Sequence, residues 1–136
     1  MEELIRVTPN KERARHILKI AEMTIERIRR VDINEFVTLT TKDYYDVIKE
    51  LMTAVALLDG YKSEGEGAHK KLIEYIEIKY KEFKKHEIQT IDDMREKRNR
   101  IYYEGLFLPE DYLDKRREDI KSAITKLKQI IIKKLL

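Results

Sequence analysis

The chain has 136 residues, of which 40% are Asp, Glu, Lys or Arg, and its formal net charge is +3. This length predicts a single domain, residues 1–136, which can bury roughly two thirds of its unfolded surface without support from a metal or disulfide. Cysteine is absent, which excludes a disulfide scaffold and a thiolate metal site and fits a cytoplasmic location. The small net charge permits RNA binding but is less one-sided than that of a dedicated non-specific nucleic-acid binder.

The N-terminus, Met1 to Leu4, lacks the shape of a signal peptide, and no long apolar run follows it. We therefore expect a cytoplasmic protein with no membrane contact. Many Lys, Glu and Ile residues together with no Cys favour a thermophilic source.

The first predicted helix spans Pro9 to Val31, with Thr8 as its N-cap and Pro9 at its first position. Its apolar residues recur at steps of three and four, which is the pattern of an amphipathic helix. Residues 32–40 have no helical period and are rich in β-branched side chains, so they predict an extended connector with Phe36 in the core.

Thr40 is the expected N-cap of a second helix, which ends at Asp59 and Gly60. Residues 51–58 are almost all apolar. A helix that is apolar around most of its girth must either be central in the fold or contact a second chain.

Residues 61–67 contain two glycines and predict the one flexible loop, followed by a third helix over residues 68–85. Residues 90–93 have the composition of a cap for a fourth helix, which runs to about Gly105, and Pro109 begins a fifth that continues to the end of the chain. These patterns predict an all-α, antiparallel up-and-down bundle of about five helices.

The fourth helix carries an unexpected charge. Its apolar seam consists of Ile91, Met94, Arg98, Ile101 and Gly105. A buried, unpaired guanidinium costs several kcal/mol, roughly, so Arg98 must meet a carboxylate, or the seam must open there into a hydrated cleft or onto a partner. Alternatively, Arg98 lays its stem on the core and holds its guanidinium in water.

Asn99 and Tyr103 are four residues apart and project from one side of the same helix, next to Arg98. The three residues form a compact polar cluster. No other constellation in the chain predicts chemistry: His16, His69 and His86 are on different elements without carboxylates at ligand spacing, so no metal site and no cofactor are predicted. Among them, His69 is notable because it lies where the third helix begins.

The chain resembles the HEPN family of small helical-bundle proteins over nearly its whole length. The resemblance is carried by residues 44–51, by residues 57–61, by His69, and above all by residues 98–103, Arg-Asn-Arg-Ile-Tyr-Tyr. The functional signature of the family is an Arg, usually followed by a polar residue such as Asn, with four to six residues in all between the Arg and a His. Arg98 and Asn99 match its start, and Tyr103 occupies the position of the His.

In members with the full motif, the resemblance implies a metal-independent endoribonuclease that works in a cleft between two subunits. The Arg stabilises charge on the attacked phosphate, and the His moves protons. Tyr103 is a poor general base at neutral pH, because an ordinary tyrosine has a pKa near 10.

Two classes of function therefore remain open. The resemblance favours a homodimer with a degenerate motif that binds RNA or a nucleotide, associated with a small nucleotidyltransferase or a toxin-antitoxin system. The alternative is an RNA-cleaving, toxin-like enzyme. We assign catalysis to Arg98, Asn99 and Tyr103, and binding to Arg95, Arg98, Tyr102 and Tyr103.

Overall fold

A computed structural model describes residues 4–136, and residues 1–3 lie outside the described part. The expectations about Met1 to Glu3 and about a domain that starts at residue 1 therefore fall partly outside it. The elements in residues 4–136 are β1 (Ile5–Arg6), α1 (Lys11–Arg29), α2 (Val37–Leu58), β2 (Tyr61–Lys62), α3 (Ala68–Lys79), α4 (Lys85–Glu104) and α5 (Tyr112–Leu135). The predicted all-α bundle is confirmed.

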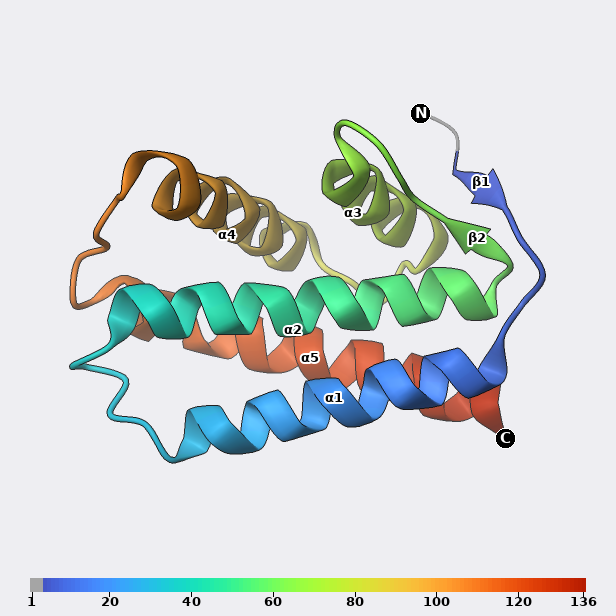
Figure 1. The fold of residues 1–136 in the computed structure, drawn as a ribbon, viewed down its shortest axis with the longest axis horizontal. Helices are drawn as coiled ribbons and strands as arrows, with labels where there is room; N and C mark the ends of the chain where they lie inside the picture. Colours follow the sequence, from blue (N-terminus) through green and yellow to red (C-terminus); the bar gives the residue numbers. More distant parts are fainter. Residues whose placement is uncertain (1–3) are drawn as a thin grey trace.

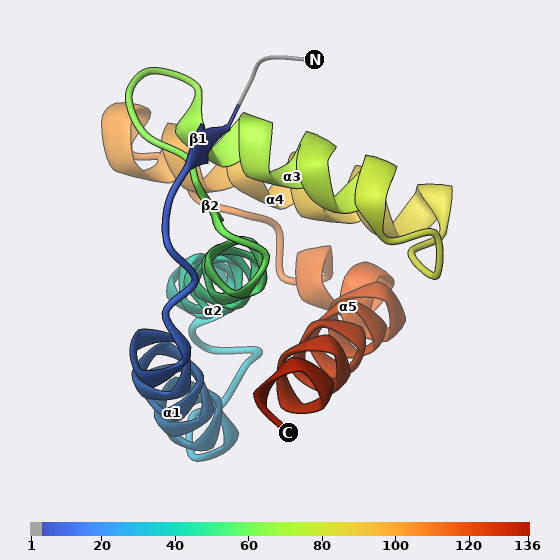
Figure 2. The same cartoon turned by 90° about the vertical axis from the view of Figure 1, so that its right-hand side faces the viewer.

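The helices form two groups (Figures 1 and 2). In Figure 2, α1, α2 and α5 are seen nearly end-on, whereas α3 and α4 run across the view above α2 and α5. Figure 1 shows that α1 and α2 run in opposite directions, joined by a loop at the left-hand end of the molecule. The second group, α3 and α4, lies on the side of α2 that faces away from α1.

α2 is the central element, because it contacts the other four helices of the described chain and β2 as well. Its second half is buried on nearly all sides, which explains the almost continuous apolar run of residues 51–58. The sequence left open whether this run is central in the fold or contacts a second chain. In the structure, α2 is central in the fold.

The starts of α1 and α2 both differ from the prediction. Asn10 caps α1, since its side-chain oxygen accepts a hydrogen bond of 3.0 Å from the Arg13 backbone N–H, and Thr8 does not. α2 begins at Val37, so the expected extended connector is partly helical. Phe36 is 42% exposed and does not enter the core, while Thr40 is buried inside the helix.

The expected flexible loop also has more structure than its composition indicated. Tyr61 and Lys62 form β2, which pairs antiparallel with Ile5 and Arg6 of β1. The Val7 backbone N–H extends this pairing by donating to the Gly60 carbonyl oxygen at 2.9 Å. The N-terminal segment is thereby fixed against the end of α2.

The break between α3 and α4 comes earlier than predicted. α3 ends at Lys79 and α4 begins at Lys85, where Glu87 accepts a hydrogen bond of 2.7 Å from the Lys84 backbone N–H. Thr90 is therefore inside α4 and does not cap it; its hydroxyl donates to Asp119 of α5 at 2.7 Å. Gly105 follows the last residue of α4, as predicted.

None of the helices in residues 4–136 combines enough length with enough apolar character to traverse a bilayer.

Candidate functional site

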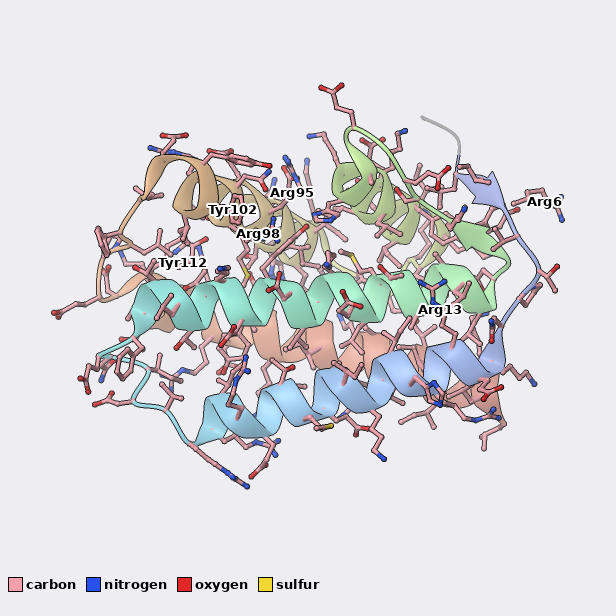
Figure 3. All side chains as sticks on the ribbon, in the orientation of Figure 1. Arg6, Arg13, Arg95, Arg98, Tyr102 and Tyr112 are labelled. Atoms are coloured by element: carbon pink, nitrogen blue, oxygen red, sulfur yellow. The ribbon has the colours of Figure 1, made fainter. Side chains whose placement is uncertain are left out.

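The polar site lies where α4 passes over the first half of α2. On α2, Asp46 is half-exposed, and on α4 Arg98 is 23% exposed, with its Nε atom 3.7 Å from Asp46 Oδ1. The guanidinium of Arg98 therefore meets a carboxylate, as expected for a charge on the apolar seam of the helix. Figure 3 shows Arg95, Arg98 and Tyr102 close together along α4, above α2 in that view.

The next turn of α4 places an aromatic ring beside the same guanidinium. The Cζ atom of Arg98 lies 5.8 Å from the centroid of the Tyr102 ring. From the α2 side, the Nζ atom of Lys42 lies 6.0 Å from the same centroid. Both distances are within the range of cation–π attraction, so the Tyr102 ring has two positive charges close to it.

Three buried side-chain polar atoms in residues 4–136 lack a hydrogen-bond partner, and they belong to residues of this one region: Tyr45 Oη, Asp46 Oδ1 and Arg98 Nε. The 3.7 Å separation of Arg98 from Asp46 is an ion-pair contact but is too long for a hydrogen bond. Buried donors and acceptors are nearly always paired in folded proteins, and an unpaired one costs about 1–3 kcal/mol. Two of the three atoms face each other across the ion pair, so the region holds one loose ion pair and one hydroxyl without a partner.

The N-terminal turn of α3 brings a titratable group to the same place. The ring centroid of His69 lies 6.0 Å from that of Tyr45, with the two planes tilted by 44°. Tyr45 is fully buried, whereas His69 is half-buried. His69 thus lies at the edge of the site, where its imidazole can be reached from outside.

Burial and neighbouring charges act on both rings. Burial lowers the pKa of His69, and the positive charges of Lys49, Arg98 and Arg95 lower it further, against an opposing effect of Asp46. His69 is therefore neutral at neutral pH and able to accept a proton. Burial raises the pKa of Tyr45 far above its ordinary range, so its hydroxyl remains a hydrogen-bond donor.

Arg95 completes the cluster on α4. Its Nε atom donates to Asp92 Oδ1 at 2.8 Å, and its side chain is mostly buried. Asp92 is also 4.0 Å from the Nζ atom of Lys70 on α3. We call the set Tyr45, Asp46, His69, Arg95 and Arg98 the Arg98 cluster.

The structure does not bring together all the residues that the sequence assigned to catalysis. Tyr103 is 77% exposed, and its ring contacts the edge of Tyr102 at a centroid distance of 5.0 Å. Tyr103 makes no hydrogen bond to Arg98 or Asn99. The assigned binding residues Arg95 and Tyr102, in contrast, both lie near Arg98.

Sequence reasoning missed Asp46 and Tyr45 and left His69 without a role. Asp46 had a detectable signal, since Lys42, Asp46 and Lys49 recur at steps of four and three on one face of α2. His69 was notable in the sequence as the histidine at the start of the third helix, but its place at the edge of this site depends on how α3 packs against α2 and α4. No group of three or more His, Cys, Asp or Glu residues in the described chain could hold a metal ion.

Comparisons of the chain with protein-family models, with curated proteins and with solved structures find no significant match.

Proposed function

We propose that the Arg98 cluster binds the phosphate of an RNA strand or nucleotide, with the protein acting as a HEPN-like binding module. The observation that carries the proposal is the loose pairing of Arg98: its Nε is 3.7 Å from Asp46 and makes no hydrogen bond. An arginine that its own carboxylate holds loosely can offer the exposed N–H groups of its guanidinium to a phosphate, and 23% of the Arg98 side chain is exposed.

The local electrostatics support an anionic ligand. At His69, three cations, Lys49, Arg95 and Arg98, act against the single carboxylate of Asp46. The hydroxyl of Tyr45 also lacks a partner, but Tyr45 is fully buried, so it can contribute only from beneath the cluster and not by direct contact with a ligand. A phosphate at the exposed edge of the cluster, beside His69, would therefore meet an excess of positive charge.

The end of α4 offers surfaces for the bases of a nucleic acid. Tyr102 is 64% exposed, Tyr103 is 77% exposed, and Phe107 in the following loop is 86% exposed. Base stacking on an exposed aromatic ring contributes about 1–3 kcal/mol per base and tolerates any base. In this proposal, Tyr103 is a stacking residue rather than the replacement for a catalytic His.

Metal-independent RNA cleavage is the second candidate, and the neutral His69 beside Arg98 favours it. His69 would take the proton of a ribose 2′-hydroxyl, whose oxygen would attack the adjacent phosphorus. The bond from phosphorus to the 5′-oxygen would break, and the proton taken up by His69 would pass through water to the leaving oxygen. The products would be a 2′,3′-cyclic phosphate and a free 5′-hydroxyl. Arg98 would stabilise the charge that develops on the phosphate oxygens.

We keep the homodimer and an association with a small nucleotidyltransferase, in a toxin-antitoxin or similar system, as parts of the proposal. The apolar residues around α2 do not support a dimer, because they are buried against the other helices of the bundle. The remaining support is the apolar end of α5, where Ile132 is 48% exposed and Leu136 is 94% exposed.

The test is binding of a fluorescent single-stranded RNA in EDTA, measured by anisotropy and followed by gel analysis of the same samples. Loss of one charged hydrogen-bond donor costs about 1.5–3 kcal/mol, so Arg98→Ala should weaken binding at least tenfold. Arg15→Ala, which removes an exposed arginine of α1, should change binding by less than twofold. Equal effects of the two substitutions would contradict the proposal.

The gel separates the two candidates. Intact RNA supports the binding module. Cleavage that is lost in both Arg98→Ala and His69→Ala would favour the second candidate instead, and cleavage that survives His69→Ala would exclude the role given to this histidine.

A further inference from the structure

A pocket of about 400 Å³ lies on the other side of α2 from the Arg98 cluster. Its walls come from the second half of α1, from Ile33 in the connector, from Tyr44 of α2 and from the first two thirds of α5. Figure 2 shows α1 and α5, the two helices that line most of the pocket, below α2. The volume is within the range of about 300–1,000 Å³ that is typical of small-molecule sites.

The inside of the pocket is aliphatic. Its apolar walls are formed by Ile25, Ile33, Leu113, Ile120 and Ile124. Ile25, Ile33 and Ile124 are partly exposed and pack against the core from this side. An acyl or alkyl chain laid along these residues would bury them further.

The charged residues that line the pocket all have the same sign: Arg29, Arg117, Lys121 and Lys128, with no Asp or Glu among the lining residues. Three of them have carboxylate partners outside the pocket, at Glu26, Asp114 and Glu22 respectively. These are solvent-exposed pairs of the kind that contributes little to stability. Lys121 has no ion-pair partner in residues 4–136 and is exposed, so its charge is available to a ligand.

The hydroxyl of Tyr44 adds a neutral donor to the cationic rim. Tyr44 is half-buried in the pocket wall, and burial raises its pKa, although Arg117 and Arg29 act in the opposite direction. Tyr44 therefore stays protonated.

From the combination of an aliphatic interior with a rim of four cations, we propose that this pocket binds a single-chain amphiphile with an anionic head group, such as a medium-chain fatty acid. The alkyl chain would lie against the isoleucines, and the head group would face Lys121 and Arg117. The inference is independent of the function proposed for the Arg98 cluster, because the two sites share no residue.

The test is calorimetric titration of the full chain with decanoate, decyl phosphate, decanol and decylamine, each kept below its micelle-forming concentration. We expect decanoate and decyl phosphate to bind with a stoichiometry near one, and decanol and decylamine to bind at least tenfold more weakly. Lengthening the carboxylate from eight to ten carbons should increase affinity by up to about fourfold per methylene, the factor equivalent to about 0.8 kcal/mol. A preference for carboxylate over phosphate would identify a fatty acid as the better ligand.

Two variants locate the binding. Lys121→Glu should weaken decanoate binding at least tenfold, whereas Lys133→Glu, an equal charge change on the exposed face near the end of α5, should not. Thr125→Trp places a ring in the pocket from an exposed position, without removing any core contact, and should block decanoate and decyl phosphate alike.

Several results would overturn the proposal. They are equal binding of decanol and decanoate, non-saturating adsorption, equal effects of the two lysine variants, or unchanged binding in Thr125→Trp. Binding to anionic lipid vesicles with no binding of free decanoate would show that the cationic residues of the pocket contact a membrane surface. This result would also overturn the proposal.

Discussion

Arg98 of α4 lies opposite Asp46 of α2, with Nε and Oδ1 separated by 3.7 Å and neither atom in a hydrogen bond. A pair made for stability would be shorter and better aligned, since charged hydrogen bonds are usually 2.7–2.9 Å long. The contrast within the same chain is clear at Glu87, which is buried and accepts a hydrogen bond of 2.6 Å from Lys126. The Arg98 pair is therefore easier for a ligand to rearrange than the pair of Glu87 and Lys126.

The loose geometry predicts weak coupling between the two residues. In a double-mutant cycle of Arg98→Met and Asp46→Asn, we expect a coupling free energy below about 1 kcal/mol, because the pair is partly exposed and not hydrogen-bonded. Urea unfolding of the wild type, the two single variants and the double variant gives this value. A coupling free energy of several kcal/mol would show that the ion pair of Arg98 and Asp46 stabilises the fold, and would contradict the prediction.

The buried Glu87 should behave in the opposite way. It is 2% exposed and accepts hydrogen bonds from Lys126, from the Ser122 hydroxyl and from the Lys84 backbone. Burial alone would raise the pKa of Glu87, but these hydrogen bonds lower it below the ordinary value. Lys126→Met leaves a buried carboxylate without its cation, so we expect the free energy of unfolding to fall by about 3 kcal/mol.

Lys133→Met, on the exposed face near the end of the same helix, is the matched control for Lys126→Met and should change the free energy of unfolding by less than about 0.5 kcal/mol. Both values come from urea titration at pH 7. If the two variants were equally stable, Glu87 would not depend on Lys126.

His69 should make stability depend on pH. Its pKa in the folded protein is lowered by burial and by Lys49, Arg98 and Arg95, so the unfolded chain binds a proton more readily. The stability linked to this group is full above about pH 6.5 and is lost as the pH falls through the lower folded pKa. Urea unfolding at pH 7.5 and pH 5.5 should therefore show a smaller loss in His69→Gln than in the wild type.

His16→Gln, which changes an exposed histidine on α1, controls for the loss of an imidazole and should lose as much stability between these two pH values as the wild type does. An identical pH dependence of the wild type and His69→Gln would contradict the assigned environment of His69.

The end of α2 gives a prediction about backbone fit. Gly60 has a φ of +89°, and a Cβ added there would lie 3.2 Å from the Val7 carbonyl oxygen. Gly65 has a φ of +83° but nothing within 4 Å. We expect Gly65→Ala to cost about 1 kcal/mol for the backbone conformation alone, and Gly60→Ala to cost about 2–3 kcal/mol because Val7 must also move. Thermal unfolding of the two variants checks the difference, and equal losses would contradict the close approach of Val7.

The bundle could be predicted from the sequence because apolar residues recur at helical spacing in every long element, α1 and α5 being the clearest. The first and last residues of the helices were harder to predict, because a side chain that could cap a helix can instead bond to another helix. Thr90 is a residue type that often caps helices, yet its hydroxyl donates a hydrogen bond to Asp119 of α5. Tyr61 and Lys62 follow a glycine and precede two more, and only the N-terminal segment beside them makes them a strand.

The candidate site shows the same limit more sharply. Periodicity placed Arg98 on the apolar seam of α4, and the need for a carboxylate followed from the cost of burying its charge. Periodicity could not identify the carboxylate as Asp46, nor bring His69 to the same place, because both depend on the packing of α2, α3 and α4. The resemblance to the HEPN motif assigned catalysis to Tyr103, which is 77% exposed and makes no hydrogen bond to Arg98 or Asn99.

The most direct test of the account is to watch the Arg98 cluster by NMR while a short oligouridylate is added in EDTA. If phosphate binds at this cluster, the Nε–H resonance of Arg98 and the ring resonances of His69 should shift together and saturate, while those of His16 and His86 stay in place. Binding of the RNA without any shift at Arg98 and His69 would contradict the proposed site.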